Sequence, residues 1–398
     1  MLANSPNLFI EIEKSKYSFF VIDNKDENNF LLVYKNSVPC QGIDNGRIID
    51  IENIYEIFRD NIYLIEKRLN FTFKEFTLIL DDCNFSFSNL TGFKKLNGSQ
   101  LVKENISYII NSLKSSLSQT ENNKKILHIF NTKYCLDRKN VQNLPIGLFG
   151  DFYTHELSFC LIEKNFYKNL KNVFDRCNLR FKKIINKSFL QGISIIKENE
   201  NLETFLKVEI NEKNSKIFFF ENSALKYVEE FTFGSDLIVN DISKILAFDK
   251  ETVLNIFINS ILNKKINEEE ILEKEYFGKT SFRKIKKTLI FEIATARIQE
   301  FAEIFIFKNI NIKHLIESKK TIVLSVSEKS NFNCFKKNYE IIFSNNNQNE
   351  LIYLEEQKIE NILRNAFEIV HFGWKKEAVP VVQAKKSIIA RLFSLLFE

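Results

Sequence analysis

Apolar and polar positions near the start of the chain predict three strands, a helix and a fourth strand. Apolar runs at residues 8–12, 17–21 and 30–34 are typical of strands, and the first two are spaced as a hairpin. Apolar residues at helical spacing predict a helix over residues 48–69, and a short apolar run predicts a strand at 76–80.

The same order of elements returns in the second half of the chain. Strand patterns at residues 204–210, 216–220 and 225–232 precede a helical pattern at 236–246. Repetition of one unit predicts two related lobes around a cleft. Later segments predict helices at residues 253–260, 285–307 and 351–371. A buried strand is predicted at residues 319–326.

The pattern differs between the two units. A helix is predicted at residues 101–117 among strand-like pieces, of which 126–134 and 155–162 are the clearest. A helix at 166–177, a strand at 180–185 and a helix starting at 189–196 follow before the second unit begins.

The last fourteen residues, KKSIIARLFSLLFE, form a strongly amphipathic pattern. On a helix, Ser387, Arg391, Ser394 and Glu398 make one narrow polar stripe. A bilayer span needs roughly 20 apolar residues, so this segment predicts a helix lying in a membrane interface, attracted to anionic lipid. The alternative is packing on the chain's own core or on a partner protein. The residues predicted to contact lipid are Lys385, Lys386, Ile388, Ile389, Arg391, Leu392, Phe393, Leu395, Leu396 and Phe397.

Composition excludes several other classes of protein. A hydrophobic fraction of 44% with 27% charged residues is that of a globular protein, and a net charge of +5 does not indicate a nucleic-acid partner. No signal peptide or transmembrane helix is predicted. The six cysteines contain no Cys-x-x-Cys pair and the four histidines no His-x-x-x-His spacing, which argues against disulfides and a metal site and favours a reducing cytoplasm.

Taken in order, five short motifs resemble the FtsA family, the actin-like membrane tethers of the bacterial cell-division ring. They are NGRIID at 45–50, ILHIFNTKYCLD at 126–137, NLPIGLFG at 143–150, FTFGSDLIVNDI at 231–242 and ARIQEFAEI at 296–304. The resemblance runs over nearly the whole chain and includes the C-terminal amphipathic segment, which corresponds to the family's membrane-targeting element.

The resemblance implies a mixed α/β, actin-like two-lobed ATPase fold with a duplicated sheet-and-helix unit. By likeness to the family, the chain divides into a first lobe (1–80 and 165–200), an inserted FtsA-specific subdomain of the SHS2 type (81–164), a second lobe (201–372, outer subdomain about 247–315), a linker (373–384) and a membrane-targeting helix (385–398).

The three glycine-bearing loops that hold ATP in this family are altered here. The family's DIGTxK aligns with EIEKSK at 11–16, DIGGGTT with EINEKNS at 209–215, and LTGGxA with LSVSEK at 324–329. Glycines let backbone N–H groups approach phosphates, whereas added acidic side chains obstruct and repel them. We therefore expect these loops to be plain turns, with ATP hydrolysis and ATP binding lost and no catalytic residues.

The alternative is a rearranged, weak site for ATP and magnesium. Its candidate residues are Lys14, Lys16, Lys213, Gly234, Ser235 and Asp241. Gly234 has a second interpretation as a plain turn before a helix that Ser235 caps.

By resemblance, the main partner is FtsZ, the tubulin-like division protein, through its acidic and hydrophobic C-terminal tail. In the family that tail docks on the outer subdomain of the second lobe. The candidate contacts are Arg283, Lys286, Lys287 and Arg297, and the alternative is a solvated basic face. The family also implies self-association and contact of the inserted subdomain with other division proteins.

The resulting expectation is a peripheral protein at the cytoplasmic face of the inner membrane, at the division site. One competing interpretation is a pilus-assembly relative, PilM, which shares the fold but lacks the lipid-binding helix. Another is a sugar kinase or phosphatase of the same superfamily. Such an enzyme needs the phosphate-loop glycines, and Glu11 and Glu209 alone do not supply turnover.

Overall fold

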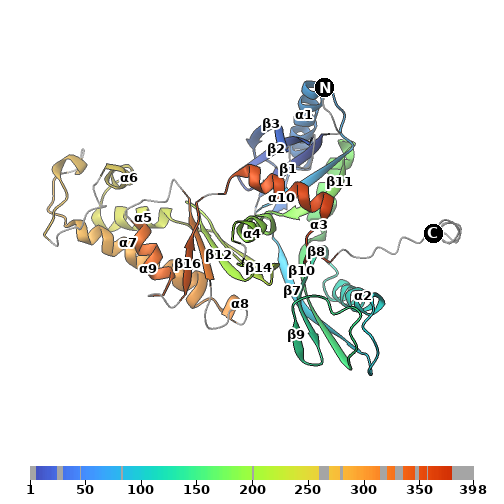
Figure 1. Ribbon diagram of the computed structural model, residues 1–398. Helices are drawn as coiled ribbons and strands as arrows, with labels where there is room; N and C mark the ends of the chain where they lie inside the picture. Colours follow the sequence, from blue (N-terminus) through green and yellow to red (C-terminus); the bar gives the residue numbers. More distant parts are fainter. Residues whose placement is uncertain are drawn as a thin grey trace.

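The computed structural model describes residues 6–24, 30–44, 46–81, 84–199, 201–259, 269–277, 281–313, 321–327, 335–345, 349–355 and 357–378. The two lobes lie side by side, and a smaller subdomain extends from the first (Figure 1). The predicted membrane-targeting segment at 385–398 lies outside the described residues. Within the described part of the chain, every helix is too short or too polar to cross a bilayer.

The first lobe is built on a five-stranded sheet in the order β11-β6-β1-β2-β3. The strands β1, β2 and β3 pair antiparallel, whereas β6 and β11 join the other side of β1 in parallel. Their bounds are Asn7–Ile12 (β1), Lys16–Asn24 (β2), Phe30–Pro39 (β3), Glu75–Leu80 (β6) and Arg180–Asn186 (β11).

The second lobe repeats this arrangement. Its sheet has the order β14-β13-β12-β15-β16, with an antiparallel half, β12 to β14, and a parallel half, β15 and β16. The bounds are Phe205–Ile210 (β12), Ser215–Glu221 (β13), Ala224–Phe231 (β14), Thr321–Val326 (β15) and Glu350–Tyr353 (β16). The predicted duplication is therefore present in strand order and in strand direction.

Helices cover the sheets and form three apolar cores. In the first lobe, α1 (Ile51–Leu69) and α3 (Lys164–Arg176) pack on one side of the sheet, where Phe58 and Phe174 stack with their ring centroids 4.8 Å apart. A second core contains α4 (Lys187–Glu198) and α10 (Ile359–Phe372), which pack against each other between the lobes. The third core belongs to the second lobe and is covered by α5 (Asp236–Leu246), α6 (Lys250–Asn259), α7 (Lys287–Ala302), the π-helical turn Glu303–Phe307, α8 (Ile310–Lys313) and α9 (Lys336–Phe343).

Helix α1 begins later than the sequence predicted. Arg47–Ile48 forms a short strand, β5, that pairs with β4 (Ile43–Asp44), and the helix starts at Ile51. Asp50 caps it, because its side chain accepts a hydrogen bond of 3.0 Å from the backbone N–H of Asn53. The helix ends at Asn70, whose φ of 49° is left-handed.

The predicted helix at 351–371 is wrong in its first part. Leu351 and Ile352 lie in β16, opposite Ile322 and Val323 of β15, and α10 starts only at Ile359. The apolar run satisfies both a helical and a strand pattern, and the exposed edge of β15 decides between them by offering backbone hydrogen bonds.

The subdomain inserted after β6 has its own sheet and helix. Its strands are β7 (Ser86–Lys95), β8 (Lys124–Leu136), β9 (Lys139–Val141) and β10 (Phe152–Glu163), in the antiparallel order β7-β10-β8-β9, and α2 (Lys103–Thr120) packs on them. Small apolar clusters on either side of Ile110 and Leu113 fill the space under α2.

Residues 374–378, called the strap below, fasten the chain that follows α10 onto the inserted subdomain. The backbone N–H of Asn131 in β8 donates to the carbonyl of Lys376 at 2.7 Å, and that of Ala378 donates to the carbonyl of Ile129 at 2.8 Å. The Trp374 indole donates to the carbonyl of Ser223, in the second lobe, at 2.8 Å. These residues belong to the segment predicted to be a linker (373–384), and the structure shows them bound to two different parts of the molecule.

Glu377 of the strap is buried in an ion cluster. Its carboxylate oxygens lie 2.7 Å from His128 Nδ1 in β8 and 2.7 Å from Lys183 Nζ in β11. Burial opposes ionisation, but His128 and Lys183 lower the pKa of Glu377 to about 2. The strap thus joins the inserted subdomain to the first lobe through buried charge as well as backbone hydrogen bonds.

Candidate functional site

The cleft between the lobes is formed where the two equivalent hairpins face each other. Residues 13–15 connect β1 to β2, and residues 211–214 connect β12 to β13. The cavity there has a volume of about 180 Å³. Typical pockets for drug-sized ligands measure roughly 300–1,000 Å³, so this space is small for a nucleoside triphosphate.

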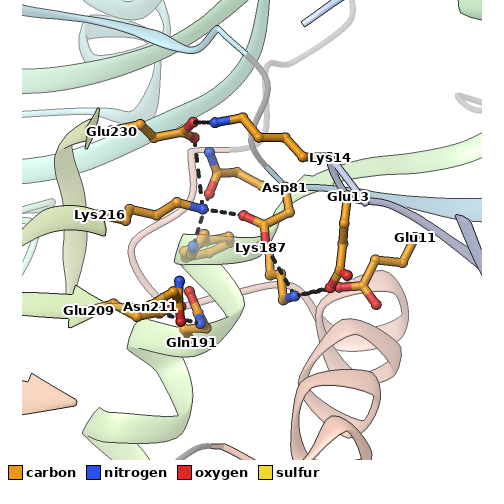
Figure 2. Close-up of polar contacts among 12 residues, drawn as sticks. Glu11, Glu13, Lys14, Asp81, Lys187, Gln191, Glu209, Asn211, Lys216 and Glu230 are labelled. Carbon is orange, nitrogen blue, oxygen red and sulfur yellow. Dashed lines mark hydrogen bonds and ion pairs between the residues drawn. The ribbon is translucent and has the colours of Figure 1, made fainter. Parts of the chain in front are cut away.

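Lys187, the first residue of α4, fills the side of the cleft that belongs to the first lobe. Its Nζ lies 2.9 Å from Glu11, 2.6 Å from Glu13 and 3.1 Å from Asp81 (Figure 2). Helix α4 is set in place by Asn186, whose side chain accepts from the backbone N–H of Phe189 at 3.2 Å. One ammonium group therefore pairs with carboxylates from β1, from the first hairpin turn and from the end of β6.

A second lysine connects this cluster to the other lobe. Lys216 of β13 is paired with Asp81 and lies 3.8 Å from Glu230 of β14, which in turn lies 3.3 Å from Lys14. Figure 2 shows Lys216 between Asp81 and Glu230, with Lys14 on the other side of Glu230. The ion pairs Lys216–Asp81 and Lys14–Glu230 therefore cross the cleft and connect the first lobe to the second.

Burial and pairing act in opposite directions on these groups. Burial would raise the pKa of Asp81, but Lys216 and Lys187 hold it well below its ordinary value. Burial lowers the pKa of Lys187, yet Asp81, Glu11 and Glu13 raise it well above the usual range. Burial dominates at Glu11 and raises its pKa despite Lys187. The structure thus contains a buried network in which carboxylates share a few ammonium groups.

Further into the cavity, polar side chains also form hydrogen bonds with one another. Glu209 accepts from Gln191 at 3.0 Å and from Asn211 at 3.3 Å. Lys207 is buried, donates to the Ser325 hydroxyl at 2.5 Å, and has its pKa lowered to about 8 by burial. Four carboxylates and four ammonium groups line the cavity, so its charges balance without an anionic ligand: Glu11, Glu13, Glu209 and Glu355 against Lys16, Lys35, Lys187 and Lys207.

The structure separates the residues predicted to hold nucleotide. Lys16 lines the cavity, where it lies 3.3 Å from Glu13, and Lys14 pairs with Glu230. Lys213 is exposed in the second hairpin turn. Asp241 lies in α5 with its carboxylate 2.6 Å from Arg297, away from the cavity lining.

Gly234 and Ser235 pack directly on the second hairpin turn. A Cβ at Gly234 would meet the carbonyl oxygen of Asn211 at 2.0 Å, so glycine is required there for close backbone contact. Ser235 stands before α5, but its hydroxyl donates to the same carbonyl at 3.3 Å instead of capping the helix. Both residues therefore fix the hairpin turn in place.

Sequence reasoning missed the three lysines that now dominate the cleft, Lys187, Lys207 and Lys216. A signal for at least one of them was present, because Glu11 lies in a segment predicted to be a strand, and a carboxylate that such a strand buries needs a cationic partner. Which lysine supplies it depends on the tertiary fold.

The four cations predicted to bind the FtsZ tail are each engaged within the outer part of the second lobe. Arg283 donates to the carbonyl of Leu246 at the end of α5. Lys287 lies 2.6 Å from Glu273, and Lys286 lies 3.2 Å from Glu269. Arg297 pairs with Asp241 and Glu300 and stands ten residues, about 15 Å, along α7 from Lys287. Among Lys286, Lys287 and Arg297, which all form ion pairs, Lys286 has the most exposed side chain, with 54% of its surface accessible.

Comparisons with known proteins agree with the expected fold. No protein-family model matches the chain. It is 24% identical over 234 residues to the cell division protein FtsA of Buchnera aphidicola subsp. Baizongia pistaciae, covering 59% of this chain and 55% of that protein. It is 18% identical over 269 residues to the cell division protein FtsA of Agrobacterium fabrum, covering 66% of this chain and 60% of that protein. The match thus spans three fifths or less of these relatives' own length.

A solved structure, of a PilM–PilN type IV pilus biogenesis complex, superposes with a TM-score of 0.52 at 9% identity, covering 92% of this chain and 98% of that chain. The predicted mixed α/β, actin-like fold is therefore confirmed, and at this identity the likeness concerns the fold alone.

Proposed function

We propose that this chain is an actin-like protein of the bacterial cell-division machinery that ties FtsZ filaments to the cytoplasmic face of the membrane and works without nucleotide. The similarity to two cell division proteins named FtsA supports the division role. The ion cluster around Lys187 is the observation that carries the nucleotide-independent part of the proposal.

The cluster occupies the position where an actin-like protein needs room and positive potential for phosphates. A triphosphate would have to lie beside Glu11 and Glu13 and to compete with both for Lys187. At an effective dielectric constant of about 20, two like charges 4 Å apart repel by about 4 kcal/mol. In proteins of this fold that bind nucleotide, a ligand in the cleft can connect the two lobes. In this chain, side-chain ion pairs connect them instead.

Attachment to the membrane is assigned to residues 385–398, through their apolar face and their basic residues Lys385, Lys386 and Arg391. A single helix of this length binds weakly, so several chains in one assembly would bind membrane cooperatively. The tail of FtsZ is assigned to the outer part of the second lobe. An acidic peptide would compete there with the carboxylates that now pair with Lys286 and Lys287.

A pilus-assembly role is the second candidate, because a PilM–PilN complex shares the fold. The two roles differ in what the C-terminal segment does. A division tether needs it to bind lipid, whereas a pilus component would bind the tail of a membrane protein instead.

Co-sedimentation of FtsZ with phosphatidylglycerol vesicles tests this proposal. We expect FtsZ to pellet with the vesicles when the full chain is present, and to stay in solution with a chain that ends at Ala384. The control is the full chain with vesicles of neutral phosphatidylcholine, which should recruit little of either protein. If the full chain pellets but FtsZ does not, the division partner is wrong; if truncation changes nothing, the membrane assignment is wrong.

A further inference from the structure

A second pocket lies between the inserted subdomain and helix α3 of the first lobe. It measures about 430 Å³ and is bounded by the end of α2, the start of β8, the end of β10 and the first turns of α3. Its residues do not overlap with those of the cleft, and nothing in the proposed function so far uses them.

The rim of this pocket is strongly basic. Five lysines line it, Lys114, Lys124, Lys125, Lys164 and Lys168, against one carboxylate, Glu121. Glu121 pairs with Lys124 at 3.1 Å, and Lys164 donates to the carbonyl of Asn122 at 3.3 Å. Among the described residues, Lys114 and Lys168 have no carboxylate within ion-pair distance, so the rim keeps an excess of positive charge.

The floor of the pocket is apolar and partly aromatic. Leu117 and Leu161 are buried there, and the Tyr167 ring lies 4.5 Å from Lys125 Nζ. Lysines around an apolar floor suit an amphiphilic ligand with an anionic head, because the charges contact the head while the floor contacts carbon.

The strap places this pocket beside the point where the described chain ends. The Ala378 side chain belongs to the same apolar cluster as Leu117 and Leu161. The strap runs antiparallel to β8, with Glu377 opposite Phe130, and so heads toward the start of that strand. Lys125 lies four residues, roughly 13 Å, beyond Ile129 in that direction. In Figure 1 the last described residues lie between the parts of the molecule labelled α3 and α2.

We propose that this pocket, defined by Lys114, Lys125, Lys164, Lys168 and Tyr167, binds the phosphate of an anionic phospholipid head group. This rests on the proposed membrane attachment, because the strap leads toward residues 385–398 from beside the pocket. The pocket gives the folded part of the molecule its own contact with the membrane, and this contact fixes the orientation of the inserted subdomain relative to the lipid surface.

The test compares two full-length variants with the same change in charge. In the first, Lys114, Lys125 and Lys168 are replaced by glutamine. The second variant is the matched control, in which glutamine replaces Lys244, Lys337 and Lys358. All three are exposed residues of the second lobe. Binding to phosphatidylglycerol vesicles is measured by co-sedimentation. At about 1 kcal/mol, or about fivefold, per lysine, the pocket variant should bind at least about tenfold more weakly, and the control variant should stay near wild type.

Two further measurements, binding of soluble glycerol phosphate and binding by the chain that ends at Ala384, distinguish the ways in which the proposal could be wrong. Equal weakening in both variants would show a diffuse charge effect and overturn the pocket. Suppose that wild type binds soluble glycerol phosphate, that the pocket variant does not, and that both bind vesicles equally well. In that case the pocket binds a soluble anion, and the lipid proposal is overturned. Vesicle binding by a chain that ends at Ala384 tests the C-terminal anchor separately. If this truncated chain no longer binds vesicles while the pocket variant binds as well as wild type, the proposed function stands and the pocket proposal is overturned.

Discussion

Replacing Lys187 with methionine is expected to lower the free energy of unfolding by about 3–5 kcal/mol, the usual cost of breaking a buried ion pair by removing one partner. The substitution keeps the length of the side chain but removes its charge. It removes the ammonium group that pairs with Glu11, Glu13 and Asp81, while the pair between Asp81 and Lys216 stays. Urea unfolding at pH 7 measures the loss.

The matched control is methionine at Lys171, whose ion pair with Asp175 is about half exposed. Exposed pairs contribute less than about 1 kcal/mol, so this variant should unfold close to wild type. Adding Glu11→Gln and Glu13→Gln to Lys187→Met should recover part of the stability, because it removes two carboxylates that no longer have Lys187 as a partner. Unchanged unfolding of the Lys187→Met variant would show that the buried cluster around Lys187 does not stabilise the fold.

Replacing Glu377 with glutamine is expected to release the strap and to lower the free energy of unfolding by about 3 kcal/mol at pH 7. The change removes a buried carboxylate that is bound to both His128 and Lys183. The pKa of about 2 gives the same magnitude, because a shift from 4.5 corresponds to about 3 kcal/mol.

The pH dependence of this variant follows from the direction of the shift. A carboxyl whose pKa is lowered on folding contributes its stability above pH 4.5 and loses it as the pH falls toward 2. The difference between wild type and Glu377→Gln should therefore be full at pH 7 and shrink below pH 4.5. Glu203→Gln, which breaks the exposed pair with Lys375 of the same strap, should cost less than about 1 kcal/mol. A difference that persisted undiminished at pH 3 would contradict the assigned role of the Glu377 charge.

The duplicated fold could be predicted because its signal is local. Each strand of the antiparallel halves is a short apolar run next to a turn, and the repeat of three strands and a helix is visible without tertiary information. Residues 351–353 show the limit of such reasoning. They have an apolar pattern compatible with a helix, and only the free edge of β15 makes them a strand.

The connections that border the cleft could be predicted in part, but the side chains that fill it could not. Loss of the glycines predicted plain turns, and residues 13–15 and 211–214 are short connections between strands, whereas residues 328–329 of the third loop lie outside the described residues. Gly234 remains because the backbone of Asn211 approaches it closely. Lys187, however, reaches Glu13 across 174 residues of sequence, and Lys216 reaches Asp81 across 135. In a chain with 56 lysines and arginines, no local pattern marks these two.

The basic residues of the second lobe show the same limit. Arg297 and Asp241 were expected at two different sites, and the structure joins them in one ion pair between α7 and α5. Residue type alone could not show that each cation there has a partner, because the partners come from other elements.

We have proposed that side-chain ion pairs close the cleft in place of a nucleotide. Calorimetric titration of the full chain with Mg-ATP tests this proposal. We predict no saturable binding up to millimolar ATP, because Glu11 and Glu13 already hold Lys187 and the cavity is balanced in charge. Saturable binding with a micromolar Kd would contradict the account, since it would require the Lys187 cluster to open and the cleft to accept a triphosphate.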